Sequence, residues 1–351
     1  MSLRDGRWRF LLVLPVMAGA IALIVWHGPN WSNVQDAFTL VRWEWVFAAI
    51  GLNLLSVLFR AYAWDTVIKQ SIAAPRPNFP LVFSAFSVGL FANAVLPGRV
   101  GELARVAVLR RRITGRRGAT ATLVGSVFAH RMFDLFPAVT LVVWVLVTAK
   151  IPGWALTSIA VVLAIGIGLF VTTVVLARRA KRDALEGLGP LRTLLVRARL
   201  GLAVMRSPTA AATAASFQFA GWTCQLFAVW SAMRAFHIYQ SLSAAGLVLV
   251  LINVATIFPL WPGNFGLVQI AIALPLVNYG VQYARGVAFG VGLQAIEASV
   301  GVGIGLIFLA REGLSFARLR EMPGAVTANE AAERSVEETP AHELARARVP
   351  G

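Results

Sequence analysis

The stretch Leu96-Pro97-Gly98-Arg99-Val100-Gly101 interrupts an otherwise apolar part of the chain. Residues 79–96 before it carry no charge, and residues 100–109 after it are mostly apolar. Proline ends the incoming helix because it lacks a backbone donor and its ring clashes with the preceding turn. Glycine then allows the chain to reverse direction. The sequence therefore predicts two short apolar helices joined by a break.

The composition places this break in a membrane protein. Hydrophobic residues make up 58% of the chain and charged residues only 14%, whereas soluble domains carry roughly 25% charged residues. The mean hydropathy is +0.72, and the apolar residues form long blocks, as in membrane-spanning helices. The net charge of +16 lies in the short loops between these blocks. We attribute it to topology and lipid contact and expect no nucleic-acid partner.

The apolar blocks predict an all-α polytopic membrane protein with about six full transmembrane helices. We place these helices at residues 10–26, 45–59, 119–148, 154–177, 209–233 and 286–310. The arginine cluster at 110–117 must be cytoplasmic by the positive-inside rule. The piece between Pro97 and this cluster is about a dozen residues, or ~20 Å, against a hydrocarbon core of ~30 Å. A re-entrant hairpin therefore fits better than two full spans. Both arrangements place the arginine cluster on the cytoplasmic side.

A second interrupted segment reads Trp261-Pro262-Gly263-Asn264-Phe265-Gly266. It lies within residues 238–284, which carry no charge and are long enough for two passes. The first hairpin would enter from the cytoplasm and the second from outside. Broken apolar segments at corresponding places in two halves indicate an inverted-repeat transporter.

The termini and one long loop complete the predicted organisation. Residues 1–310 form the transmembrane domain, and basic residues before the first span place the N-terminus in the cytoplasm. Residues 178–208 mix arginines with leucines, as in an amphipathic segment on an anionic leaflet or in a solvated linker. We predict a disordered cytoplasmic tail at 311–351, which is poor in large apolar residues.

Each Pro-Gly break could bind an anion. A helix that begins inside the membrane has unpaired N–H groups with partial positive charge, which need a partner in hydrocarbon. An anionic headgroup provides one, and Arg99 adds a full positive charge. The alternative is a kinked helix whose polar groups are satisfied by its neighbours.

Several charged residues lie within or beside the apolar blocks, where each costs ~2.5–3.5 kcal/mol at the centre of a helix. They are Arg99, Glu102, Arg105, Arg131, Asp134 and Glu297. Arg131 and Asp134 are spaced to share one helix face, and so are His130 and Asp134. These residues either form structural salt bridges or line a polar cavity for a phosphate group. Glu297 has no charged neighbour on its own helix, and its partner could be Arg131 or Arg99.

Templates for catalysis and metal binding are absent from the sequence. We find no Walker loop, GxSxG, HExxH or DxD pair, and the four histidines are scattered. The single cysteine, Cys224, excludes a disulfide framework. We therefore expect no enzyme, no cofactor and no metal site.

Three motifs resemble one family. Residues 93–105, Asn-Ala-Val-Leu-Pro-Gly-Arg-Val-Gly-Glu-Leu-Ala-Arg, resemble the N-x-x-L-P-x-R-x-G-E-x-x-R signature of the lysylphosphatidylglycerol synthase transmembrane region, or flippase-like domain family. Residues 130–134 are similar to its E-R-x-x-D, and residues 262–269 to its P-G-G-x-G-x-x-E. His130 and Gln269 replace two family acids, which removes the carboxylates that proton coupling at those positions would need. The resemblance covers roughly residues 10–310.

This resemblance implies movement of lipids or lipid-linked intermediates across the bacterial inner membrane. Aminoacyl transfer is not expected, since the family's synthase domain does not fit in the remaining tail. We expect these substrate-binding residues: Asn93, Pro97, Gly98, Arg99, Gly101, Glu102, Arg105, His130, Arg131, Asp134, Pro262, Gly263, Asn264, Gly266, Gln269 and Glu297.

The leading hypothesis is a flippase-like transporter for an anionic phospholipid or a polyprenyl-phosphate-type lipid, with membrane lipids as its partners. A membrane-embedded lipid-headgroup transferase is the second hypothesis, with Glu102, His130 and Asp134 as acid or base. The third is a non-transporting scaffold that binds envelope-biosynthesis proteins through the 178–208 loop and the tail.

Overall fold

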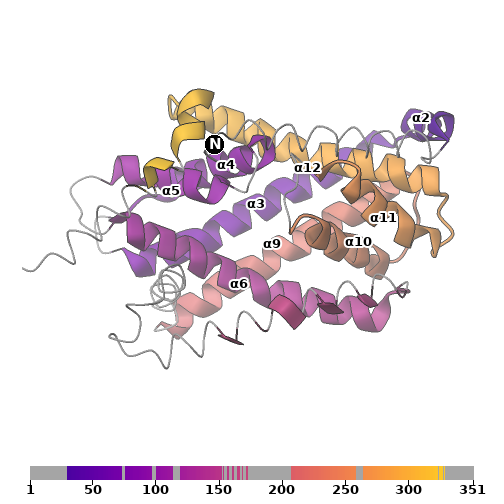
Figure 1. Cartoon of the computed structure of the whole chain (residues 1–351), viewed down its shortest axis with the longest axis horizontal. Helices are drawn as coiled ribbons and strands as arrows, with labels where there is room; N and C mark the ends of the chain where they lie inside the picture. Colours follow the sequence, from indigo (N-terminus) through magenta and orange to yellow (C-terminus); the bar gives the residue numbers. More distant parts are fainter. Residues whose placement is uncertain are drawn as a thin grey trace, which may run out of the picture.

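A computed structural model of the chain describes residues 30–72, 76–96, 100–113, 119–151, 207–257 and 264–322, with scattered positions at 153–172 and 324–328. Every regular element in these ranges is a helix, which confirms the all-α prediction (Figure 1). The helices are α2 (Trp31–Thr39), α3 (Trp43–Ser71), α4 (Phe79–Val95), α5 (Gly101–Arg112), α6 (Ala119–Thr148), α9 (Pro208–Ala235), α10 (Leu242–Ala255), α11 (Leu267–Val277) and α12 (Tyr283–Arg311).

Helices occur at four of the predicted spans. Three of them, α3, α6 and α12, are long and apolar enough to cross a membrane. The predicted spans at 10–26 and 154–177 and the basic segment 178–208 fall largely or wholly outside the described residues.

Four short helices flank the two predicted breaks, and three of them, α4, α10 and α11, are apolar. Helix α4 has 17 residues and α5 has 12, while α10 has 14 and α11 has 11. At 1.5 Å per residue, each is shorter than a hydrocarbon core of about 30 Å. Asn78 caps α4 through its side-chain oxygen, and Ser241 caps α10 in the same way. The chain therefore breaks where the sequence predicted.

The described helices repeat in the order long, short, short, long. The first four, α3 to α6, begin at residues 43, 79, 101 and 119, and the second four, α9 to α12, begin at 208, 242, 267 and 283. The interval is close to the 165 residues that separate Arg60 from its hydrogen-bond partner Gln225. The contacts repeat too, since α4 packs on α12 as α10 packs on α6.

Helices α3 and α9 cross at the centre of the molecule and run in opposite directions. At one end the Arg42 N–H donates to the Ala235 carbonyl, and at the other Tyr62 stacks on Phe217. Figure 1 shows α4 and α5 towards one end of the long axis and α10 and α11 towards the other. The two short-helix pairs therefore lie at opposite ends of an antiparallel central pair.

Each short-helix pair builds its own hydrophobic core. One core joins α4 and α5 to the C-terminal half of α3, the start of α6 and the end of α12. The other joins α10 and α11 to the end of α9, the start of α12 and the N-terminal part of α3. Trp64 is fully buried in the first core and Phe289 in the second.

The packed region extends beyond the boundary that we predicted at residue 310. Residues 316–322 form a short helix, and Leu314, Leu319 and Met322 are buried in the same core as α4 and α5. The prediction of a disordered tail from residue 311 was therefore wrong for this part. These three side chains supply the apolar surface that anchors it.

Candidate functional site

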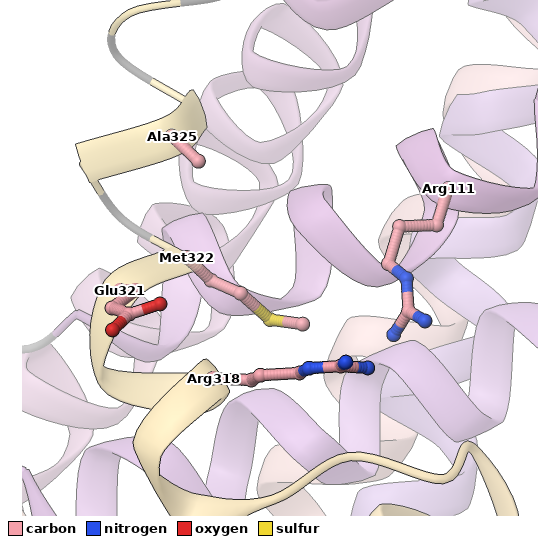
Figure 2. Close-up of a pocket in the computed structure, with 5 residues that line it drawn as sticks. All are labelled: Arg111, Arg318, Glu321, Met322 and Ala325. Atoms are coloured by element: carbon pink, nitrogen blue, oxygen red, sulfur yellow. The ribbon is translucent and has the colours of Figure 1, made fainter.

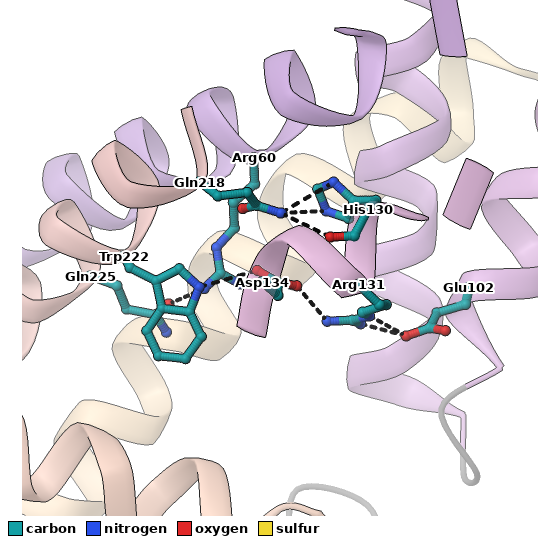
Figure 3. Close-up of polar contacts among 8 residues, drawn as sticks. All are labelled: Arg60, Glu102, His130, Arg131, Asp134, Gln218, Trp222 and Gln225. Carbon is teal, nitrogen blue, oxygen red and sulfur yellow. Dashed lines mark hydrogen bonds and ion pairs between the residues drawn. The ribbon is translucent and has the colours of Figure 1, made fainter. Parts of the chain in front are cut away.

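A chain of polar side chains links helices α5, α6 and α9 (Figure 3). Arg131 on α6 donates from Nε to Glu102 on α5 at 2.7 Å and from Nη1 to Asp134 at 3.2 Å. Trp222 on α9 donates from Nε1 to the other Asp134 oxygen at 3.1 Å. We call Glu102, Arg131, Asp134 and Trp222 the polar relay. Three of these residues were predicted site residues, and the structure brings them together.

His130 adjoins the relay and is held by an amide. It is buried, with Gln218 Nε2 3.2 Å from its Nδ1 and donating to its backbone carbonyl at 3.3 Å. The edge of Phe86 packs against the imidazole ring. In the described part of the chain, no three His, Cys, Asp or Glu side chains are grouped to hold a metal ion.

Arg60 belongs to this region, and the sequence analysis did not identify it. We had ended the second span at Phe59, but α3 continues to Ser71 and Arg60 lies within it. Its Nη2 donates to Gln225 on α9 at 2.9 Å, and its guanidinium lies 5.2 Å from the centre of the Trp222 ring. The signal that could have found it is the helical spacing of the buried residues that follow: Ala61, Trp64, Val67 and Ile68.

Glu297 on α12 interacts electrostatically with Arg60 on α3, and Gln225 lies near its carboxylate. Of the two candidates from the sequence, Arg131 pairs with Glu102 and Asp134 instead, and Arg99 lies outside the described residues. Arg60 also interacts electrostatically with Asp134. It therefore lies between Glu297 and the relay in the network of charges.

Arg105 on α5 is a buried cation with unused donors. Its side chain is only 4% exposed, and its guanidinium lies over the rings of Trp64 at 4.6 Å and Phe86 at 5.5 Å. Its Nε and one Nη find no hydrogen-bond partner among the described residues. Cation–π contacts stabilise the charge but leave these N–H groups unpaired. Arg105 can therefore donate to an anion.

Among the described residues, a hydrogen bond and a close backbone approach join the two sides of the first break. The Gly101 N–H donates to Asn93 Oδ1 at 2.8 Å, which joins the end of α4 to the start of α5. Gly89 and Gly101 approach so closely that a methyl group on either would meet the other's carbonyl oxygen. Of the predicted residues here, Pro97, Gly98 and Arg99 lie outside the described ranges.

At the second break the polar groups satisfy one another. Asn264, at a φ of 45°, donates from Nδ2 to the Ala255 carbonyl at 2.8 Å. Gln269 accepts from the Gly266 N–H at 2.6 Å and donates to Gln294 Oε1 at 2.6 Å. In the described part of the chain, no hydrogen bond joins this group to the relay. Gln294 and Glu297 are neighbours on one face of α12, and Pro262 and Gly263 are not described.

These contacts predict how substitutions of Gln269 behave. Gln269→Leu should lower the free energy of unfolding by about 1–3 kcal/mol, because it leaves the buried Gly266 N–H without its acceptor and removes the hydrogen bond to Gln294 Oε1. Gln269→Glu should be tolerated, because a carboxylate still accepts from Gly266 and a flipped Gln294 amide can donate to it. Thermal unfolding in detergent tests both variants. Equal stability of the leucine variant and wild type would contradict this role.

The comparison with known proteins agrees with the three motifs. The family model described as "Lysylphosphatidylglycerol synthase TM region" matches residues 8–305. No curated protein and no solved structure matches the chain. The family is one of multi-pass membrane proteins with a lipid-related envelope function. Since the match covers most of the chain, this protein belongs to the lysylphosphatidylglycerol synthase transmembrane-region family.

Proposed function

We propose that this protein is a flippase-like transporter, not an enzyme, that moves an anionic phospholipid or a polyprenyl-phosphate-type lipid between the leaflets of the bacterial inner membrane. The observation that carries the proposal is the buried, incompletely satisfied Arg105 beside the relay, inside an apolar bundle. Charged residues at membrane depth are costly, and they mark substrate pathways when they face a cavity or a ligand.

The charges near the first break favour a phosphate group. Arg131 is balanced by Glu102 and Asp134, and Arg60 interacts with Glu297. Arg105 forms no ion pair with any described carboxylate and lies one turn from the start of α5 at Gly101. The first N–H groups of a helix carry partial positive charge. A phosphate near this helix end could therefore accept from Arg105 and be favoured by the partial positive charge of the α5 N-terminus.

The helix arrangement supports alternating access. In the proposed topology, α4–α5 and α10–α11 are re-entrant hairpins from opposite sides, and about six full spans surround them, with both termini in the cytoplasm. Two observations support it: the short helices lie at opposite ends of the molecule, and α3 runs antiparallel to its counterpart α9. Inverted repeats allow one half to move against the other around a central site.

Translocation in proteoliposomes tests the proposal directly. Fluorescent phosphatidylglycerol and phosphatidylcholine are placed in both leaflets, and a membrane-impermeant quencher reports transfer from the inner leaflet. We expect transfer of the anionic lipid at least about tenfold faster than of the neutral lipid, and no transfer in protein-free vesicles. Chemical conversion of a lipid by the purified protein would favour the transferase hypothesis. If a folded protein moves neither these lipids nor a labelled polyprenyl phosphate, the transporter proposal is wrong and a scaffold is favoured.

A further inference from the structure

A pocket of about 310 Å³ lies where the end of α5 meets the chain that follows α12. Five residues line it: Arg111, Arg318, Glu321, Met322 and Ala325. Figure 2 shows the Arg111 and Arg318 guanidinium groups directed towards the same space from opposite sides, with the Met322 thioether beside them. The pocket is separate from the relay, and none of its residues was predicted as a site residue.

The two arginines that flank Arg111 have partners among the described residues, whereas Arg111 has none there. Arg110 donates to the Ile113 carbonyl and to Thr120, and Arg112 forms an ion pair with Glu312. Glu312 also accepts from Ser84. These contacts tie the end of α5 to α4, α6 and α12. Of the arginines at positions 110–112, only Arg111 lines the pocket.

Two like charges share the pocket, and Glu321, the acid among its described lining residues, forms no ion pair with either. Among the described residues, no carboxylate lies within ion-pair distance of Arg111 or Arg318, and Figure 2 shows the Glu321 carboxylate on the far side of Met322 from both guanidinium groups. The C-terminal carbonyls of α5 offset only about half a charge. Two guanidinium groups in one pocket repel each other unless an anion lies between them, and phosphate oxygens match their donor geometry.

The surroundings favour a lipid as the source of that phosphate. The candidate span α12 ends at Arg311, so the pocket lies at the level where the apolar span gives way to polar residues. The last turns of α12 expose Leu306 and Ile307, which can contact acyl chains. Basic pockets at the ends of transmembrane helices bind anionic headgroups in this way.

We propose that Arg111 and Arg318 bind the phosphate of an anionic phospholipid headgroup as a resident lipid at the membrane surface. The lipid bridges α5 to the 316–322 helix. This site does not depend on the transport function, because it shares no residue with the relay or with the first break.

The test of this site is the amount of anionic lipid that the purified protein binds. The full chain is purified in detergent, incubated with labelled phosphatidylglycerol or phosphatidylcholine and analysed by native mass spectrometry. We expect the R111Q/R318Q variant to lose at least about tenfold in phosphatidylglycerol binding, because it removes both guanidinium groups that donate to the headgroup phosphate. The matched control is R311Q/R320Q, which removes the same charge from exposed arginines next to the pocket. It should retain wild-type binding.

Four outcomes decide the proposal. It is overturned if R111Q/R318Q binds phosphatidylglycerol like wild type, or if the control variant loses as much binding. Competition by inorganic phosphate at millimolar concentration, as strong as competition by lipid, would show a free-anion site instead. If R111Q/R318Q unfolds, the charge-retaining R111K/R318K variant replaces it. That variant should keep a preference for phosphatidylglycerol over phosphatidylcholine, and equal binding of the two lipids would contradict the proposal.

Discussion

Replacing Arg131 by glutamine should abolish lipid translocation. The substitution removes both cationic hydrogen bonds of the relay and leaves Glu102 and Asp134 without their shared partner. An uncompensated buried carboxylate destabilises a protein by 3–5 kcal/mol in the strongest cases. We expect about 3 kcal/mol, the lower end, because the Arg131 side chain is 45% exposed. The quencher assay measures the transfer rate, and thermal unfolding in detergent measures stability.

A neutral relay separates the loss of function from the loss of stability. The triple variant Glu102→Gln/Arg131→Gln/Asp134→Asn keeps the shapes of the two acidic side chains and removes all three charges of the relay together. We expect its stability to return close to that of wild type while translocation stays absent. Arg42→Gln is the control for a generic ion pair, because Arg42 and Glu44 are exposed at the start of α3, and it should transport normally. Normal transport by the triple variant would reduce the relay to a structural role.

Gly101→Ala should destabilise the α4–α5 pair by about 3 kcal/mol and abolish transport. The added methyl group would meet the Gly89 carbonyl oxygen and lie 2.6 Å from Asn93 Cγ and 2.7 Å from its Oδ1. Two backbones in contact have no flexible atoms that can move aside, so α4 and α5 must separate. Separation breaks the Gly101–Asn93 hydrogen bond and displaces Arg105.

Gly303→Ala is the matched control for that variant. Gly303 lies in α12, and a methyl group there has no neighbour within 4 Å. Alanine is favoured over glycine in a helix interior by about 0.5–1 kcal/mol, so this variant should be as stable as wild type or more stable. The difference in melting temperature between this variant and Gly101→Ala measures the loss of stability that comes from the close Gly89–Gly101 contact. If Gly101→Ala unfolds at the wild-type temperature, the packing between α4 and α5 is looser than described.

The sequence predicted the helices well where charged residues, proline or glycine mark the helix ends. Residues 119–148 are bounded by an arginine cluster and by Lys150, and α6 has those limits. The two Pro-Gly segments predicted the breaks because proline and glycine act locally. Such signals depend only on neighbours in the sequence.

Other features depend on contacts between distant segments. A single arginine after an apolar run commonly ends a span, so Arg60 was assigned to a loop. Its partner Gln225 is 165 residues away, and neither residue indicates the other in the sequence. Sequence spacing also paired Arg131 with Asp134 correctly but gave no sign that Glu102 completes the relay. The site therefore needed the tertiary structure.

The hydrogen bond between Arg60 and Gln225 has an evolutionary consequence. Its partners occupy equivalent positions in two antiparallel helices, α3 and α9. In a protein whose halves were identical, a residue at this crossing would face its own copy. Two arginines would repel each other there, whereas two glutamines could hydrogen-bond. If the halves arose by gene duplication, a single-unit ancestor that paired as a dimer would have been restricted to a neutral residue here. Only fusion of the two copies would have allowed one of them to acquire the charge.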